Sequence, residues 1–376
     1  MSPGDPSPQP GTMLLVVLGW LGLVGQLLPR AAAQPSFNRT EGVVQVGSCQ
    51  GLKSKVELGL DITIVVDSDL LCGETISLLP GQEVKLSSWS QQQQLVVIAE
   101  DFLVHDPTSS TLLVVSEGAS LSLTNLRFTN EVGVQGSPGA VRAIWNAGTV
   151  DISMCTFESL NYAGEQDGGA IYNTGEYVVV SVENSTFAGN VGKDRGGAIA
   201  AIGQGSVDVR NCTFFANEAI GASPERRAGS GGAVYASPGM VVGIVNSSFE
   251  SCLGRYGGAA LFLCGGSVED STFSGNEADG LFGAVVNGDL SDDERANASV
   301  ALNPVGSGTY SCPALFIAGT VFEENTSGNG YGGAIASVDA GLSVFNSTMV
   351  GNIGGALYFG TGDDTGRDQL DVSCKH

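Results

Sequence analysis

The chain has 376 residues, of which 55 are glycine, 42% are hydrophobic and only 15% are charged. This composition provides enough apolar side chains for a core and many turns, so it excludes an intrinsically disordered chain. The formal net charge of −23 excludes nucleic acid and anionic membrane surfaces as expected partners, because both repel an acidic protein.

An apolar segment lies near the N-terminus. Residues 14–28 are almost entirely aliphatic, and Arg30 is followed by three alanines before Gln34. A run of this length is short for a membrane span and is typical of a secretory leader with a small-residue cleavage site. We therefore expect residues 1–33 to be a signal peptide and the protein to be secreted or displayed at the cell surface. Residues 1–13 carry no Lys or Arg, which leaves an uncleaved membrane anchor as the alternative.

Short β-branched and aliphatic runs in the first third of the chain predict strands. They cover Asp61–Asp67, Glu83–Leu86, Gln94–Ala99, Thr111–Val115 and Ser120–Thr124. Residues 34–58 precede these runs. We expect them to form an N-terminal cap, because the open edge of a first strand invites aggregation unless it is covered.

Two short motifs alternate from about residue 128 to residue 360. Phe-x-x-Asn begins at Phe187, Phe214, Phe273 and Phe322, and a variant begins at Met349. Gly-Gly-Ala plus an aliphatic residue begins at Gly168, Gly196, Gly231, Gly257, Gly332 and Gly354. Counting the weaker copies Pro138–Ala140 and Phe282–Ala284, successive alanines of this motif are 22 to 50 residues apart. Such self-similarity is typical of stacked repeat architectures.

The intervals between motifs predict the repeat unit. They contain short Val, Ile and Ala runs separated by Gly, Asn and Ser, without a useful helical period or a leucine framework. One coil of a parallel β-helix fits this pattern, with Phe inside, Gly at sharp turns and stacked Asn side chains. We therefore predict an all-β fold, a single-stranded right-handed parallel β-helix (β-solenoid) of roughly ten coils. It would span residues 59–360, with an acidic tail at 361–376.

The alternation of Phe-x-x-Asn and Gly-Gly-Ala-Ile resembles the repeats of chlamydial polymorphic outer-membrane proteins. The resemblance covers about residues 125–360, and the coil pattern is similar to that of the pectin-lyase-like β-helix superfamily. The first resemblance implies surface display and adhesion, and the second implies a pectin-lyase fold.

Eight cysteines in an exported chain allow disulfide bonds. We expect Cys49 to pair with Cys72 near the cap, and Cys252 to pair with Cys264 within one coil. Cys155 and Cys212 hold the same place in coils that are two steps apart, which is beyond the reach of a disulfide.

Asn-x-Ser/Thr tripeptides predict glycosylation if the chain passes through a eukaryotic secretory pathway. The better acceptors are Asn38 and Asn297, which lie outside the repeats. The copies at Asn184, Asn211 and Asn246 are part of the repeat itself, so a turn role is the alternative for them.

The sequence predicts no cofactor. Only two histidines and no Cys-x-x-Cys pair occur, which disfavours zinc. Calcium is possible at two acidic clusters, although neither follows an EF-hand spacing and solvated loop charge is the simpler interpretation. The clusters are Asp289, Asp292, Asp293 and Glu294 in a long insertion, and Asp363 with Asp364 in the tail.

Segments between Phe-x-x-Asn and Gly-Gly-Ala vary most, and they recur at one angular position of the coil. Aromatic and charged residues in them suit recognition of a polysaccharide or a surface protein. The candidate binding residues are Tyr162, Asp167, Asp194, Arg195, Tyr256 and Tyr331. Scattered exposed side chains without a role are the alternative.

The favoured function is non-catalytic, namely adhesion or binding of an extracellular polysaccharide or cell-surface protein through the lateral face of the solenoid. The runner-up is a pectin-lyase-like polysaccharide lyase or glycoside hydrolase. The carboxylate, calcium and arginine motifs of such enzymes are missing, as are nucleophile and phosphate-loop motifs. A structural component of a cell wall or matrix is the third possibility.

Overall fold

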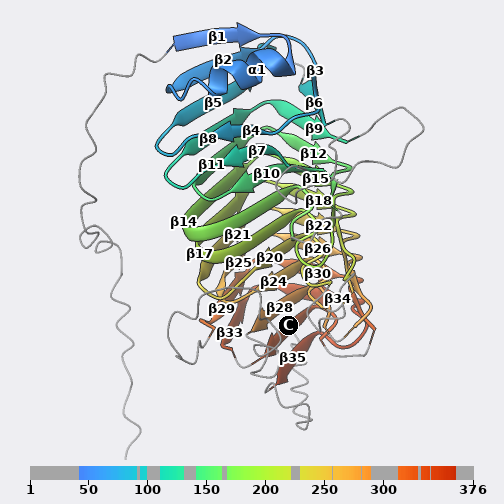
Figure 1. Ribbon diagram of the computed structural model, residues 1–376. Coiled ribbons are helices and arrows are strands. Elements are labelled where there is room, and N and C mark those ends of the chain that lie inside the picture. Colours follow the sequence, from blue (N-terminus) through green and yellow to red (C-terminus); the bar gives the residue numbers. More distant parts are fainter. Residues whose placement is uncertain are drawn as a thin grey trace, which may run out of the picture. The chain divides into compact units, whose positions relative to one another are not determined.

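The structure is a computed structural model, and it describes residues 42–90, 94–99, 111–130, 141–162, 167–221, 229–255, 257–280, 282–288, 312–328, 332–338 and 340–360. Within these ranges the chain is a parallel β-helix, in which equivalent strands of successive coils pair side by side (Figure 1). The fold class predicted from the repeats is therefore confirmed. Strand runs Ile62–Val66, Leu95–Ala99 and Thr111–Val115 lie where the sequence places them.

Each complete coil contributes strands to four parallel ladders in a fixed order. We number the ladders 1 to 4, and the strands of each are given below. Along the chain, a coil passes first through ladder 2 and then through ladders 1, 3 and 4. Ladders 1 and 2 join into one 19-stranded sheet, because the long strands β14 (Ile171–Glu183) and β17 (Ile199–Arg210) run through both.

The other strands of ladder 1 are β1 (Gly42–Val46), β2 (Ile62–Val66), β5 (Glu83–Ser88), β8 (Ser120–Thr124), β11 (Thr149–Ser153), β21 (Met240–Val245), β25 (Gly266–Glu269), β29 (Leu315–Ala318) and β33 (Leu342–Phe345). Those of ladder 2 are β4 (Ile76–Leu78), β7 (Thr111–Val115), β10 (Arg142–Asn146), β20 (Val234–Ala236), β24 (Leu261–Leu263), β28 (Val285–Gly288), β32 (Ile335–Val338) and β35 (Leu357–Gly360).

Ladder 3 is a 10-stranded sheet among the described residues, in agreement with roughly ten coils. Its strands are β3 (Leu70–Cys72), β6 (Leu95–Ala99), β9 (Leu126–Thr129), β12 (Thr156–Glu158), β15 (Thr186–Ala188), β18 (Thr213–Phe215), β22 (Ser248–Glu250), β26 (Thr272–Ser274), β30 (Val321–Glu323) and β34 (Thr348–Val350). Ladder 4 comprises β13 (Asn161–Tyr162), β16 (Val191–Gly192), β19 (Glu218–Ala219), β23 (Leu253–Gly254), β27 (Glu277–Ala278) and β31 (Thr326–Ser327).

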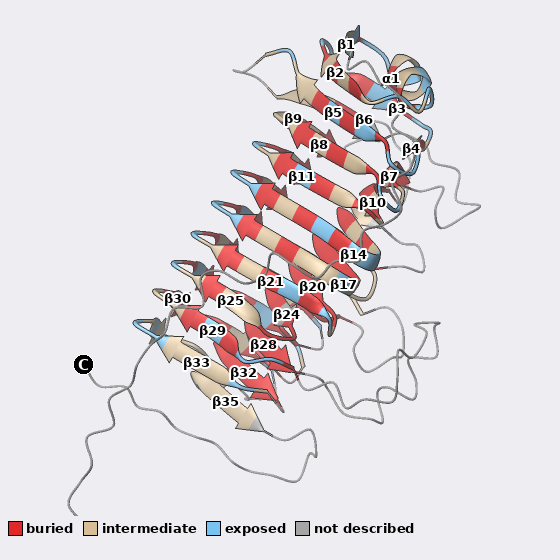
Figure 2. Ribbon diagram, turned by 90° about the vertical axis from the view of Figure 1, so that its left-hand side faces the viewer, coloured by how far each residue is buried: buried red, intermediate tan, exposed pale blue. Residues whose placement is uncertain are grey.

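The core is a stack of equivalent side chains. Alternate residues of each strand point inward, so buried and exposed positions alternate along strands such as β14 and β21 (Figure 2). The phenylalanines of ladder 3 stack face to face, with ring centroids 4.6 to 5.0 Å apart and interplanar angles of 2° to 9°. They are Phe128, Phe157, Phe187, Phe214, Phe249, Phe273 and Phe322.

The asparagines of Phe-x-x-Asn stack into a ladder beside the phenylalanines, as predicted, and the structure shows this ladder to be buried. Asn190 Nδ2 donates to Asn217 Oδ1 at 2.9 Å and to the carbonyl oxygen of Phe157 at 3.0 Å. Asn276 and Asn325 repeat the pattern. Cys252 occupies the equivalent position between Asn217 and Asn276 and interrupts the ladder. These amides therefore satisfy backbone groups in the interior of the tube.

The Gly-Gly-Ala motif lies where the chain enters ladder 2. Gly196 has a φ of +62°, a conformation that costs other residues energy. A Cβ added to its neighbour Gly197 would overlap the carbonyl oxygen of Gly232 in the next coil. Gly196 therefore forms the sharp turn that the sequence predicts, and Gly197 allows two backbones to approach closely.

The first coil is covered by a short helix, α1 (Cys49–Val56), whose Leu52 and Val56 are buried in the main core. Ser48 caps this helix, because its Oγ accepts a hydrogen bond from the Gly51 amide at 3.1 Å. The expected Cys49–Cys72 disulfide is present and attaches the helix to β3.

The expected pairing of Cys252 with Cys264 is wrong. Cys264 forms a disulfide with Cys312, and Cys252 is a free, buried thiol. Cys252 lies just before β23 of ladder 4, whereas Cys264 lies just after β24 of ladder 2, so the two are apart around one coil. Cys264 and Cys312 instead lie next to strands of adjacent coils that pair in register, β25 with β29. Stacking between coils, rather than closeness in sequence, brings thiols together.

Candidate functional site

The outer face of ladder 2 carries a row of aromatic residues. Trp145 pairs in register with Tyr172 on the next coil, and Tyr235 follows two coils further on, after Ala200. Their neighbours Ile144, Ile171 and Val234 point into the core, so the rings point outward. Trp145 and Tyr172 are partly exposed, whereas Tyr235 is buried. We call Trp145, Tyr172 and Tyr235 the aromatic row.

Two arginines lie over this row. The guanidinium carbon of Arg142 is 4.8 Å from the ring centroid of Tyr172, and that of Arg195 is 5.3 Å from the centroid of Tyr235. Arg142 is fully buried, and it donates to the carbonyl oxygens of Gly168 at 2.9 Å and Asp167 at 2.5 Å. These hydrogen bonds hold the Arg142 guanidinium against the ring of Tyr172.

An ion pair borders the same region. Arg195 Nη1 lies 3.8 Å from Asp167 Oδ2, and the two side chains are 21% and 12% exposed. Burial raises the pKa of the Asp167 carboxyl from 3.8 to about 6; Arg195 opposes this shift, Asp194 adds to it and Arg142 opposes it. Burial also raises the pKa of Tyr172, and the charge of Asp167 acts in the same direction.

The structure brings together three of the candidate binding residues, Asp167, Asp194 and Arg195, from two successive coils. Asp167 and Arg195 are largely buried, whereas an open recognition site requires exposed side chains. Tyr256 and Tyr331 lie outside the described residues, and for Tyr162 only the backbone is described, in β13.

Sequence reasoning missed Arg142 and the aromatic row. A signal was available, because each residue lies on an alternating strand pattern close to a Gly-Gly-Ala copy, as in Ala170-Ile171-Tyr172. That pattern places every second side chain on the outer face.

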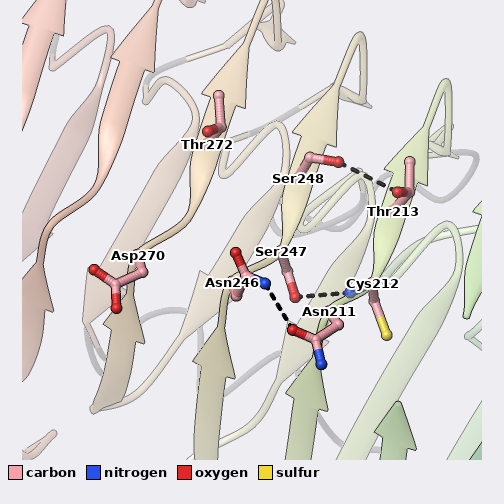
Figure 3. A pocket seen from close by; sticks show the side chains of 8 residues that line it. All are labelled: Asn211, Cys212, Thr213, Asn246, Ser247, Ser248, Asp270 and Thr272. Atoms are coloured by element: carbon pink, nitrogen blue, oxygen red, sulfur yellow. Dashed lines mark hydrogen bonds between the residues drawn. The ribbon is translucent and has the colours of Figure 1, made fainter. Parts of the chain in front are cut away.

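A polar depression of about 240 Å³ lies on another part of the surface, between ladders 1 and 3 (Figure 3). Three successive coils line it with the same kinds of side chain. These are Asn211, Cys212, Thr213, Asn246, Ser247, Ser248, Asp270 and Thr272. Asn246 Nδ2 donates to Asn211 Oδ1 of the adjacent coil at 2.7 Å.

The described ranges contain no group of three or more His, Cys, Asp or Glu side chains suited to a metal ion. Both acidic clusters considered for calcium, together with Asn38, Asn297 and the signal-peptide region, lie outside those ranges. Within the part of the chain that the structure describes, the helix is too short and polar to cross a membrane.

The free thiols are structural. Burial raises the pKa of Cys155 and Cys212 to about 11 and that of Cys252 to about 12. Thiols with such values stay protonated near neutral pH, and a protonated thiol is a poor nucleophile.

The fold defines this chain as a parallel β-helix protein. No family model matches it, and no curated protein matches it. Similar solved structures are a PL6-family alginate lyase, AlyGC, and the Streptococcus pneumoniae surface protein and adhesin PfbA.

The lyase has 9% identity and a TM-score of 0.38, and the alignment covers 89% of this chain and 41% of the lyase. The adhesin has 13% identity and a TM-score of 0.36, with 83% and 94% covered. The chain thus spans less than half the length of the lyase. The fold assignment rests on the strand register of this chain itself.

Proposed function

We propose that this chain is a secreted or cell-surface protein that binds an extracellular polysaccharide through the lateral face of its β-helix, without cleaving it. The single observation that carries this proposal is the aromatic row on ladder 2, where the partly exposed rings of Trp145 and Tyr172 lie on adjacent coils. Flat rings pack against the apolar faces of sugars, and neighbouring charged groups bind hydroxyl groups.

A neutral polysaccharide fits this face better than an acidic one. The net charge of −23 repels polyanions over the whole molecule. The two cations beside the row are engaged, since Arg142 is buried against carbonyl oxygens and Arg195 pairs with Asp167. The resemblance of the repeats to surface-displayed adhesion proteins supports the extracellular location.

The way in which the charged groups are held supports binding without catalysis. A general acid or base must reach the substrate to transfer a proton. The Asp167 side chain is only 12% exposed and Arg195 is 21% exposed, and they are paired with each other. Their geometry supports a role in holding the loops beside the row.

One observation favours the alternative, a polysaccharide hydrolase or lyase. Asp167 has a pKa of about 6 and lies near a second carboxylate, Asp194. A carboxyl with a raised pKa beside a second carboxylate is an arrangement that glycosidases use.

A glycan array and a soluble-polysaccharide screen of the full chain, produced by a eukaryotic secretory host, test the proposal. We expect retention of at least one neutral polysaccharide and no release of reducing or unsaturated sugar. Trp145→Ala should weaken binding about 10-fold, which corresponds to about 1.4 kcal/mol. Phe215→Ala is the matched control, because Phe215 is 46% exposed on ladder 3, away from the row.

Sugar release would overturn the proposal in favour of the enzyme. Absence of retention on every glycan would favour a structural role instead. An equal loss of binding in Trp145→Ala and Phe215→Ala would show that the aromatic row is not the binding face.

A further inference from the structure

Among the described residues, Asn-x-Ser/Thr tripeptides occur at two different positions in the coil. Four asparagines lie at the corner between ladders 1 and 3, namely Asn184, Asn211, Asn246 and Asn346. We call this the asparagine corner. A fifth, Asn325, belongs to the buried asparagine ladder. The same tripeptide is therefore presented in two opposite ways.

At the asparagine corner the acceptor amide faces solvent. All four asparagines are exposed and have left-handed φ values of 44° to 52°. This conformation turns the chain so that the middle residue of the tripeptide points inward, as Cys212 and Ser247 do. The hydroxyl residue that follows points outward again, as Thr213 and Thr348 do.

Asn325 is presented in the opposite way. It is 0% exposed, and its Nδ2 donates to the carbonyl oxygen of Phe273 at 3.0 Å and to Asn352 Oδ1 at 2.9 Å. Both amide hydrogens are therefore used inside the tube. A sugar on this nitrogen would remove one hydrogen bond and would have no space.

The open depression at the corner surrounds the attachment points with polar groups. It is lined by Asn211, Asn246 and the hydroxyl groups of Thr213 and Ser248 (Figure 3). A glycosylated amide keeps one N–H, so Asn246 can still donate to Asn211 Oδ1.

We propose that the asparagine corner is a column of N-glycosylation sites and that the folded, secreted chain carries no glycan on Asn325. The inference rests on the proposed passage of the chain through a secretory pathway. In the reaction, Nδ2 of the asparagine forms a bond to the anomeric carbon of an oligosaccharide carried on a lipid diphosphate. The bond from that carbon to the diphosphate oxygen breaks, and the proton lost from Nδ2 leaves with the diphosphate.

Spacing along the corner sets the expected occupancy. Asn184, Asn211 and Asn246 lie on consecutive coils, and strands of adjacent coils are about 4.8 Å apart. Oligosaccharides on neighbouring coils therefore crowd each other. Asn346 is separated from Asn246 by two coils whose corner residues are Asp270 and Gly319. We expect full occupancy at Asn346 and partial occupancy within the group of three.

The test uses the full chain in a mammalian secretory host, once with its own leader and once with residues 1–33 replaced by an established leader. Enzymatic removal of N-glycans in heavy-oxygen water converts each modified asparagine to labelled aspartate, which peptide mass spectrometry locates. Thr348→Val and Thr186→Val remove the hydroxyl of a tripeptide while keeping the asparagine in its turn. Each should abolish the label at its own site only.

Labelled Asn346 together with unlabelled Asn325 is the expected result. Label at Asn325 in folded, secreted protein would overturn the inference, as would a chain recovered from the medium with no label at any corner asparagine. The arm with the established leader separates the two proposals. Glycans in that arm alone would support the inference and contradict the proposed secretion by the native leader.

Discussion

Replacing Asn276 by Ala tests whether the asparagine ladder stabilises the fold. Asn276 is 0% exposed and makes three side-chain hydrogen bonds. Its Nδ2 donates to the carbonyl oxygen of Phe249 at 3.0 Å and to Asn325 Oδ1 at 2.9 Å, and its Oδ1 accepts from the Cys252 amide at 3.0 Å.

The expected loss follows from the groups left behind. Truncation to Ala leaves the Cys252 amide without its acceptor and the Phe249 carbonyl without one donor. A buried polar group that loses its partner costs about 1 to 3 kcal/mol, so we expect the free energy of unfolding to fall by about 3 to 5 kcal/mol. Urea unfolding followed by circular dichroism measures this loss.

The reciprocal variant, Cys252→Asn, restores the ladder where it is interrupted. Cys252 lies in register between Asn217 and Asn276, and its sulfur is 3.8 Å from the carbonyl oxygen of Phe214. An asparagine here gains the bonds its neighbours make, so we expect unchanged or increased stability. The reasoning is refuted if Asn276→Ala costs less than about 1 kcal/mol, or if Cys252→Asn destabilises by more than about 2 kcal/mol.

Two further predictions concern the core and the ion pair. Phe214→Ala should lower the free energy of unfolding by about 3 to 5 kcal/mol, because the ring is fully buried between Phe187 and Phe249. The adjacent Phe215→Ala, on the outer face, should change it by less than about 1 kcal/mol, and equal losses in the two variants would contradict the stacked core. For Asp167, the pKa in the folded protein, about 6, is above its usual 3.8, so the carboxyl holds a proton more tightly when folded. Its stability contribution is therefore complete below about pH 4 and is lost as the pH rises to about 6, by about 3 kcal/mol. Urea unfolding across this range should show Asp167→Asn gaining stability relative to wild type as the pH rises. A difference between the two proteins that does not change with pH, or that runs in the opposite direction, would exclude the raised pKa.

Much of the fold could be predicted because the repeat is local. In Phe-x-x-Asn, Phe214 and Asn217 are three residues apart, so their positions within one coil do not depend on distant parts of the chain. Gly196 and Gly197 similarly mark a turn and a close backbone approach from their own residue type. Fold class and strand positions follow from such short-range patterns.

The candidate site could be predicted only in part. Asp167 and Arg195 belong to segments that recur at one angular position, and this is why they meet. Their burial, and the rings of Trp145 and Tyr172 beside them, depend on which outer faces the neighbouring coils cover. A short sequence motif contains no information about which outer faces are covered.

The sequence by itself determined that coils of parallel strands stack, that phenylalanines point inward and the asparagines of Phe-x-x-Asn stack, and that the chain is acidic and apolar enough to fold. Only the tertiary structure decided that Cys264 pairs with Cys312, and that Asn211 faces solvent while Asn325 does not. The physical reason is that alternation and turn conformation act within a few residues. Which residues become neighbours on adjacent coils depends instead on the loops between the strands. These loops differ in length, so stacked residues are separated by different distances along the chain.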